Sequence, residues 1–209
     1  MPSLPTHARA AIFDVYGTLL HGPRHPDTLR RMNAVVARFD LPALPDIDLV
    51  FTTAIAAAHR RSPEPWPEVD VRELWSEIFP GLADPDAFSL EIEEAIHPVR
   101  PHPIGAALLD EAASRGLRLG IVSNAQAYTP ILLARHFPTL WPLIEPALTA
   151  FSFHHRIAKP DPRLFRVPLD ALTADGIAPR EIVMIGDSPE NDLAPARTLG
   201  MHTIAIPPA

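Results

Sequence analysis

The sequence contains no cysteine and no apolar run long enough to cross a bilayer. Among 209 residues there is not one Cys, which excludes a disulfide framework and thiol catalysis and fits a reducing compartment. No apolar run approaches the ~20 residues that a membrane-spanning helix needs. The first residues, MPSLPTHARA, lack the charged and apolar regions of a signal peptide. We therefore expect a cytoplasmic protein that contacts no membrane.

Basic residues are also scarce. Lys and Arg together number 18 against 25 Asp and Glu, so the formal net charge is −7. Nucleic-acid binding needs an excess of basic side chains to meet the phosphates, so we expect a small-molecule substrate and no nucleic acid. Proline is abundant, at 26 residues against an average near 5%, which indicates rigid turns and helix starts. Nothing in the composition indicates an oligomeric state.

The second half of the chain alternates between helical and strand patterns. Buried strands are expected to end at Ser123 and Asp187, and a last strand is expected over HTIAI. The segments between them have helical spacing, with Gly116 and Gly200 just past two helix ends. Strands separated by helices predict an α/β fold with a Rossmann-like parallel sheet core flanked by helices. Pro168 falls inside one of these helical segments and predicts a kink or a break there.

Residues 21–97 differ from the rest because helical spacing recurs with no clear strand between. We interpret this region as an inserted α-helical cap domain, with residues 1–20 and 98–209 forming the core. Its tryptophans, and Trp141 in the core, are expected to pack rather than to bind substrate. The pair His154–His155 has no regularly spaced metal-ligand partners.

Polar residues recur at the ends of the predicted apolar strands. Asp14, Ser123 and Asp187 end apolar runs, Lys159 follows the short piece RIA, and Asp192 comes shortly after Asp187. Ligands of open parallel sheets bind beyond the carboxyl ends of the strands. We therefore expect these five side chains to meet at one edge of the sheet.

In this order, the residues resemble the four motifs of the haloacid dehalogenase-like hydrolase superfamily. The first motif, Asp-x-Asp-Gly-Thr, is matched by Asp14, Gly17 and Thr18, with Tyr16 in place of the second Asp. The second is matched by Ser123, followed by Asn124, and the third by Lys159. The fourth is matched by Gly186, Asp187 and Asp192. The helical insertion after the first strand resembles the cap domain of this superfamily.

The resemblance implies a role for each residue. Asp14 would be a carboxylate nucleophile, and Lys159 would supply positive charge to it and to the transferring group. Thr18, Ser123 and the Asn124 backbone N–H would hold substrate oxygens. Mg²⁺ would be bound by Asp14, Asp187, Asp192 and the backbone carbonyl of Tyr16, which suits a cation that prefers oxygen ligands.

Tyr16 leaves two chemistries open. Family phosphatases use the second Asp as a general acid for the leaving alkoxide, whereas Asp-x-Tyr-Gly-Thr resembles the 2-haloacid dehalogenases, whose halide leaves without a proton. That branch typically lacks the counterpart of Asp187, and its cap arginine has no match before Arg60 and Arg61. Its tyrosine after the lysine corresponds to Phe165. We therefore favour a Mg²⁺-dependent phosphatase acting on a small phosphorylated metabolite, with the dehalogenase as the alternative.

Without the second Asp, another group could protonate the leaving group. His21, His25 and Asp27 lie just after the first motif and are candidates for this general acid. Tyr16 could instead only pack against the cap. A third hypothesis is a catalytically weak protein that binds a phosphorylated ligand.

Overall fold

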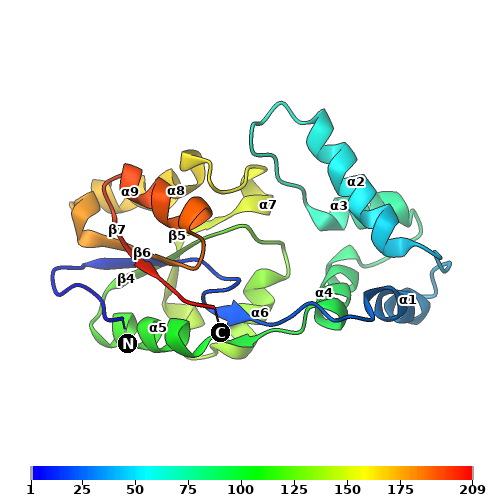
Figure 1. Ribbon diagram of the computed structural model, residues 1–209, viewed down its shortest axis with the longest axis horizontal. Coiled ribbons are helices and arrows are strands. Elements are labelled where there is room, and N and C mark those ends of the chain that lie inside the picture. Colours follow the sequence, from blue (N-terminus) through cyan, green and yellow to red (C-terminus); the bar gives the residue numbers. More distant parts are fainter. Residues whose placement is uncertain (1, 209) are drawn as a thin grey trace.

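The computed structural model describes residues 2–208, so only the ends of the predicted core range, residues 1 and 209, lie outside it. Its centre is a sheet of five parallel strands in the order β5-β4-β1-β6-β7 (Figure 1). These strands are β1 (Ala10–Phe13), β4 (Arg118–Ser123), β5 (Ile144–Phe151), β6 (Ile182–Gly186) and β7 (His202–Ala205). The predicted α/β class with a parallel Rossmann-like sheet is confirmed.

Helices cover both faces of the sheet. The apolar side chains of β1 alternate between the two faces, so each face has an apolar surface for helices to bury. Ala11 and Phe13 pack in the apolar cluster that contains α5 and α6, while Ala10 and Ile12 pack with α8 and α9. The helices are α5 (Pro103–Ser114), α6 (Thr129–His136), α8 (Pro162–Ala174) and α9 (Ala194–Thr198), with the short α7 (Ser152–His155) after β5. Burial of every β1 side chain makes this strand the centre of the core.

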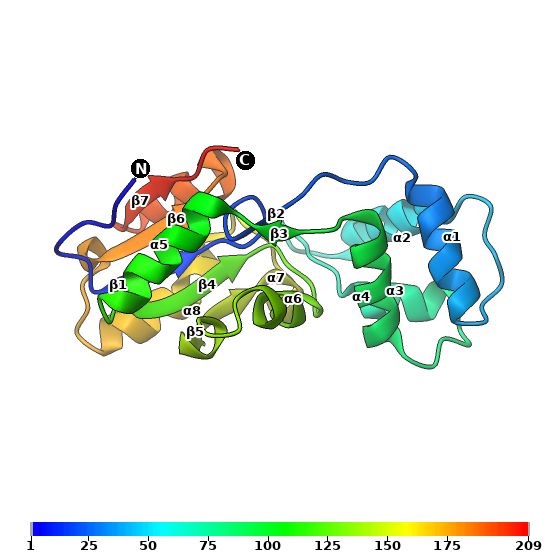
Figure 2. The ribbon, with the colours of Figure 1, turned by 90° about the horizontal axis from the view of Figure 1, so that it is seen from below.

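Four more helices lie at the other end of the molecule (Figure 2). They are α1 (Thr28–Arg38), α2 (Ile47–Arg61), α3 (Val71–Ile78) and α4 (Pro85–Ile96). The chain enters and leaves them through a two-stranded antiparallel sheet of β2 (Leu20–His21) and β3 (Arg100–Pro101). They enclose an apolar cluster of their own, in which Trp75 stacks on Phe51 with ring centroids 4.1 Å apart. Treating residues 21–97 as a separate cap domain stays a prediction.

Three local features differ from the expectations. Strand β5 was not predicted: it is an edge strand that contains Pro146, which its position at the edge tolerates. Helix α8 runs without a break through the buried Pro168, which packs in the core. Trp66 is half exposed rather than packed, at 50%, while Trp75 and Trp141 do contact apolar clusters.

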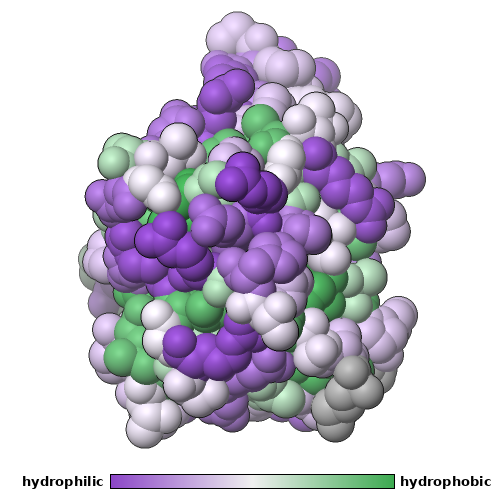
Figure 3. All heavy atoms as spheres, turned by 90° about the vertical axis from the view of Figure 1, so that its left-hand side faces the viewer, coloured by the Kyte–Doolittle hydropathy of each residue, from purple (hydrophilic) through white to green (hydrophobic). Residues whose placement is uncertain are grey.

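The surface of the core away from α1–α4 carries polar side chains with smaller apolar areas between them (Figure 3). Within residues 2–208, no helix has both the length and the apolar character that crossing a membrane requires.

Candidate active site

The carboxyl edge of the sheet brings the predicted polar residues together. The chain passes from β1 to β4 and β5 on one side and returns to β6 and β7 on the other, and ligands bind at such a switch point. A cavity of about 370 Å³ opens there, which we call the reaction hollow. It is lined by Asp14, Tyr16, Asn124, Lys159, Asp187, Ser188, Asn191 and Asp192.

Asp14 is held at the base of this hollow with one oxygen engaged. Its backbone N–H donates to Ile185 O of β6 at 2.9 Å, and only 4% of the residue is exposed. Oδ1 accepts from Ser123 Oγ at 2.9 Å and from Lys159 Nζ at 2.5 Å. Oδ2 accepts no hydrogen bond from the side chains of residues 2–208. The carboxylate is thus oriented, and Oδ2 is its oxygen available to an electrophile.

Lys159 is the only lysine in the sequence. Its Nζ is buried between Asp14 Oδ1 and Asp192 Oδ1, at 2.5 Å from each. Asn124 fixes the backbone of Lys159, because its Oδ1 accepts from Lys159 N at 2.7 Å and its Nδ2 donates to Lys159 O at 3.3 Å. An ammonium is a compact point charge, which suits a site this narrow. Burial opposes the charged form, but the two carboxylates raise the pKa of Lys159 overall.

Two glycines allow the carboxylates of Asp187 and Asp192 to lie close to the backbone. A Cβ on Gly17, where φ is +87°, would lie 2.3 Å from Asp187 Oδ2. A Cβ on Gly186 would lie 2.4 Å from Asp192 Oδ2. Asp192 Oδ2 also accepts from the Ser188 backbone N–H at 3.0 Å. Any side chain at positions 17 or 186 would therefore displace a carboxylate.

The three carboxylates suit a divalent cation. Oxygens of Asp14, Asp187 and Asp192 all lie within 4.8 Å of one another. Burial and the Asp14 charge raise the pKa of Asp187, and the same two causes raise that of Asp192 to about 6. With a single ammonium among three carboxylates, the ionised cluster carries a charge of −2. Hard oxygen ligands with excess negative charge are the donor set that Mg²⁺ prefers, so the residues fit this ion.

Tyr16 has its side chain engaged within the protein. Its hydroxyl is bonded to Thr129 Oγ1 at 3.0 Å. Burial and the Glu93 carboxylate raise the pKa of the phenol far above its ordinary value, so it holds its proton more tightly than a free tyrosine does. Tyr16 also packs against the apolar cluster of the core. Its side chain forms a wall of the hollow.

A second cavity, of about 230 Å³, shares Tyr16 and Asn124 with the reaction hollow, and we call it the side hollow. It is lined by Tyr16, Glu68, Glu93, His97, Asn124, Ala125, Gln126 and Tyr128. Sequence reasoning missed Glu68, Glu93, His97, Gln126 and Tyr128. The first three belong to the helical region and reach the site only through folding, so no spacing in the sequence marks them.

Other predicted residues lie elsewhere. Thr18 is fully buried, its hydroxyl has no hydrogen-bond partner within residues 2–208, and it lines neither hollow. His21 lines another hollow, which also contacts Asp187 and Gly17. His25 and Asp27 line neither the reaction hollow nor the side hollow, and Asp27 pairs with Arg30 at the surface.

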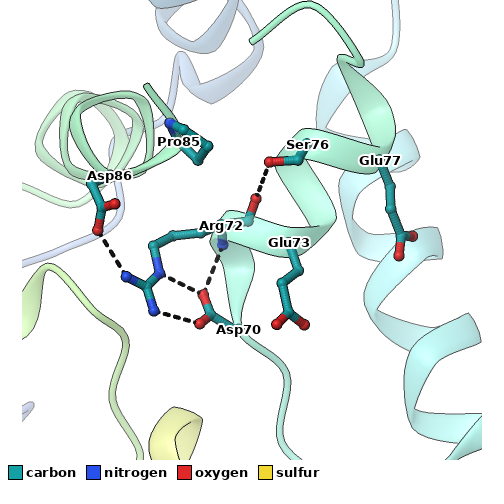
Figure 4. Close-up of a pocket in the computed structure, with 7 residues that line it drawn as sticks. All are labelled: Asp70, Arg72, Glu73, Ser76, Glu77, Pro85 and Asp86. Atoms are coloured by element: carbon teal, nitrogen blue, oxygen red, sulfur yellow. Dashed lines mark hydrogen bonds and ion pairs between the residues drawn. The ribbon is translucent and has the colours of Figure 1, made fainter. Parts of the chain in front are cut away.

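A larger hollow beside α3 and α4 is built differently (Figure 4). Arg72 donates to both oxygens of Asp70, at 2.9 and 2.7 Å, and to Asp86 at 2.9 Å. Glu73 pairs with Arg156. Most charges here are paired, and the Glu73–Arg156 pair joins α3 to the core. None of the predicted site residues lines this hollow, so it is not the reaction site.

Comparison with known proteins agrees with this geometry. A family model described as haloacid dehalogenase-like hydrolase matches residues 8–200. The chain belongs to this family. It is 37% identical over 111 residues to a phosphoserine phosphatase of Thermus thermophilus, covering 50% of this chain and 40% of that protein. It is 26% identical over 209 residues to a phosphoglycolate phosphatase of Rhodospirillum rubrum, covering 95% and 79%.

The family fold is also found among solved structures. A haloacid dehalogenase family enzyme of Bacteroides thetaiotaomicron, solved as a magnesium complex, superposes with a TM-score of 0.64. The match covers 98% of this chain and 96% of that one at 16% identity. Such a low identity shows the shared fold alone. The chain spans 40% of the length of the Thermus relative.

Proposed function

We propose that the protein is a Mg²⁺-dependent phosphatase that hydrolyses a small phosphorylated metabolite through an aspartyl-phosphate intermediate. One observation carries the proposal: Asp14 lies against Lys159, with Asp187 and Asp192 close enough to share one cation. Membership in a hydrolase family with phosphatase relatives supports it.

Asp14 Oδ2 attacks phosphorus, a P–O bond to Asp14 forms, and the bond from phosphorus to the substrate oxygen breaks. The leaving alkoxide takes its proton from water. Ser123 and Lys159 hold Oδ1 so that Oδ2 points to the substrate. Asp14, Asp187, Asp192 and the backbone carbonyl of Tyr16 would hold Mg²⁺, which supplies positive charge for the phosphoryl oxygens. Water then cleaves the acyl phosphate, releases phosphate and regenerates Asp14. In this proposal α1–α4 act as the cap over the site.

The test is Mg²⁺-dependent release of phosphate from an aryl phosphate, which we expect to be lost in Asp14→Asn and on chelation by EDTA. An aryl alcohol leaves without a strong acid, so the assay does not depend on the missing general acid. If divalent cations have no effect on phosphate release, the proposal is wrong.

Tyr16 keeps the dehalogenase as the second candidate. A 2-haloacid carries a carboxylate that needs a cationic partner, yet no arginine lines either hollow beside Asp14 in the described chain. Arg60 and Arg61 line neither. Metal-independent halide release from 2-chloropropionate would show that the protein is a dehalogenase instead. Binding of phosphorylated metabolites without turnover would favour the ligand-binding hypothesis.

A further inference from the structure

We propose that the side hollow binds the ammonium end of the substrate, a small phosphomonoester whose alcohol carries an amine and no carboxylate. This inference rests on the proposed phosphatase function, since it assigns the leaving-group end of the same site. The side hollow lies next to the reaction hollow, because Tyr16 and Asn124 line both. In this proposal, a substrate with its phosphoryl group beside Asp14 extends its alcohol past these two residues toward Glu68 and Glu93.

Glu68 is the carboxylate of the side hollow that forms no ion pair with any described residue, although Arg61 and Arg156 line a neighbouring hollow that Glu68 also borders. Its Oε1 accepts from Val69 N at 2.8 Å and Gln126 Nε2 at 3.4 Å, and its Oε2 accepts from Ser152 Oγ at 2.7 Å. All three donors are neutral groups, so they orient the carboxylate and leave its charge in place. An ammonium is the ligand that such a held, uncompensated carboxylate binds.

Glu93 adds a second carboxylate that already has partners. Its Oε1 contacts His97 Nδ1 at 2.9 Å, and its Oε2 accepts from Tyr128 OH at 3.0 Å. His97 Nε2 donates to Gly22 O at 2.8 Å, so both ring nitrogens face acceptors and the ring is held as an imidazolium that neutralises Glu93. His97 is therefore engaged within the protein and is not free to bind a substrate carboxylate.

The remaining walls favour a cation and disfavour an anion. Tyr16 and Tyr128 contribute aromatic rings, whose faces attract ammonium groups. Among the described residues, no lysine or arginine lines the side hollow. A substrate with a carboxylate on its alcohol would bring that carboxylate beside Glu68 without a cationic partner. The volume of about 230 Å³ limits the alcohol to a few heavy atoms.

The experiment compares kcat/KM, with Mg²⁺ present, for O-phosphoethanolamine and 2-hydroxyethyl phosphate, which differ by an ammonium against a hydroxyl. O-Phosphoserine and phosphoglycolate test the effect of a carboxylate, and an aryl phosphate reports basal activity. We expect phosphoethanolamine to be preferred by about 10-fold or more over each of the other three metabolites, which is the size of one hydrogen bond to a charged group.

The decisive variant is Glu68→Gln, which removes the charge and keeps the shape. We expect it to abolish the preference for phosphoethanolamine over 2-hydroxyethyl phosphate, so that the ratio of the two kcat/KM values falls to about 1. Glu77→Gln, an exposed α3 carboxylate outside both hollows, is the matched control and should keep the preference. A merely structural role of Glu68 would lower all rates together, so the ratio between substrates separates the two. Glu93→Gln serves as a second variant if the first does not fold.

Two outcomes overturn the inference while leaving the phosphatase proposal intact. One is aryl phosphate turnover with phosphoserine or phosphoglycolate preferred, and the other is a preference that Glu68→Gln does not change. If no phosphomonoester is hydrolysed, the proposed function fails by itself. Calorimetric titration of phosphoethanolamine into the parent and Glu68→Gln proteins then tests whether the side hollow binds the ammonium group. Equal affinities for the two proteins refute this binding.

Discussion

Lys159→Met should destabilise the protein strongly in the absence of divalent cations. The Lys159 side chain is 4% exposed, and its Nζ contacts two carboxylates at 2.5 Å. Removing one partner of a buried ion pair typically costs about 3–5 kcal/mol, because the other charge stays buried and unpaired. In the variant, the ionised cluster changes from a charge of −2 to −3. Two carboxylate charges no more than 4.8 Å apart repel by at least about 3.5 kcal/mol at an effective dielectric constant of 20.

The loss should depend on pH with a definite sign. The folded-state pKa of Asp192 is raised to about 6, above the unfolded value near 3.9. Ionisation of Asp192 therefore costs folding stability as pH rises through its folded pKa. Without Lys159, this pKa rises further, so protonation offsets more of the damage at low pH. We expect the free-energy difference between parent and variant to reach about 3–5 kcal/mol at pH 8 and to shrink toward pH 5.

Urea unfolding of parent and variant at pH 5 and pH 8, with EDTA or with Mg²⁺, measures how the free energy of unfolding depends on Lys159, on pH and on the metal. Mg²⁺ at 100 times its Kd would stabilise the protein by about 2.7 kcal/mol, and the more negative variant should gain more than the parent. Arg180→Met removes an exposed basic side chain and is the control, expected to change stability by less than about 0.5 kcal/mol. A Lys159→Met protein destabilised by less than about 1 kcal/mol at pH 8 without metal would refute the buried-charge reasoning.

Further predictions concern the walls of the site. The hydrogen bond to its glutamate partner raises the pKa of His97, so the stability that this contact adds is full below pH ~6.5 and is lost as pH rises through the folded pKa. In urea titrations, His97→Gln should therefore lower the free energy of unfolding by about 1 kcal/mol more at pH 5.5 than at pH 9. The difference is this small because the ring is 29% exposed. An equal loss at both pH values would contradict the prediction. Gly17→Ala should weaken Mg²⁺ activation, because the added Cβ would displace Asp187. The control Gly116→Ala, also at positive φ but in open space, should lower stability alone. Equal Mg²⁺ activation in both variants would count against a close contact between Gly17 and Asp187. Tyr16→Asp should raise alkyl phosphate hydrolysis by up to about 10²–10⁴-fold, and an unchanged rate would mean that another group already protonates the alcohol.

The sheet and the residues at its edge could be predicted because each depends on local signals. Apolar runs that end in Asp14, Ser123 and Asp187 mark the buried parallel strands and their carboxyl ends. Strand β5 gives a weaker signal, because it lies at the sheet edge, contains a proline and has half-exposed positions. The sequence predicts a helix with a kink or a break at Pro168, but α8 continues through it because packing of the buried ring in the core compensates for the missing hydrogen bond.

The side hollow could not be predicted, since its residues come from separate parts of the chain. Glu68 lies between α2 and α3, Glu93 in α4 and Gln126 before α6. They meet because Gln126 Nε2 donates to Val69 O and its Oε1 accepts from Val71 N, both at 3.0 Å. This amide joins the core to the helical region through a contact between residues more than 50 positions apart. No periodicity or motif encodes such a contact.

Tyr16 and the side hollow bear on the same chemical problem, the departure of the alcohol. An alkoxide leaves slowly without a proton, and the Tyr16 phenol, bonded to Thr129 and with a raised pKa, is a poor donor. An ammonium group near the departing oxygen withdraws electron density and lowers the pKa of the alcohol, so the reaction depends less on a general acid. The gain from Tyr16→Asp should therefore be smaller for phosphoethanolamine than for 2-hydroxyethyl phosphate. A site that binds ammonium through Glu68 would in this way tolerate a tyrosine at the position of the acid.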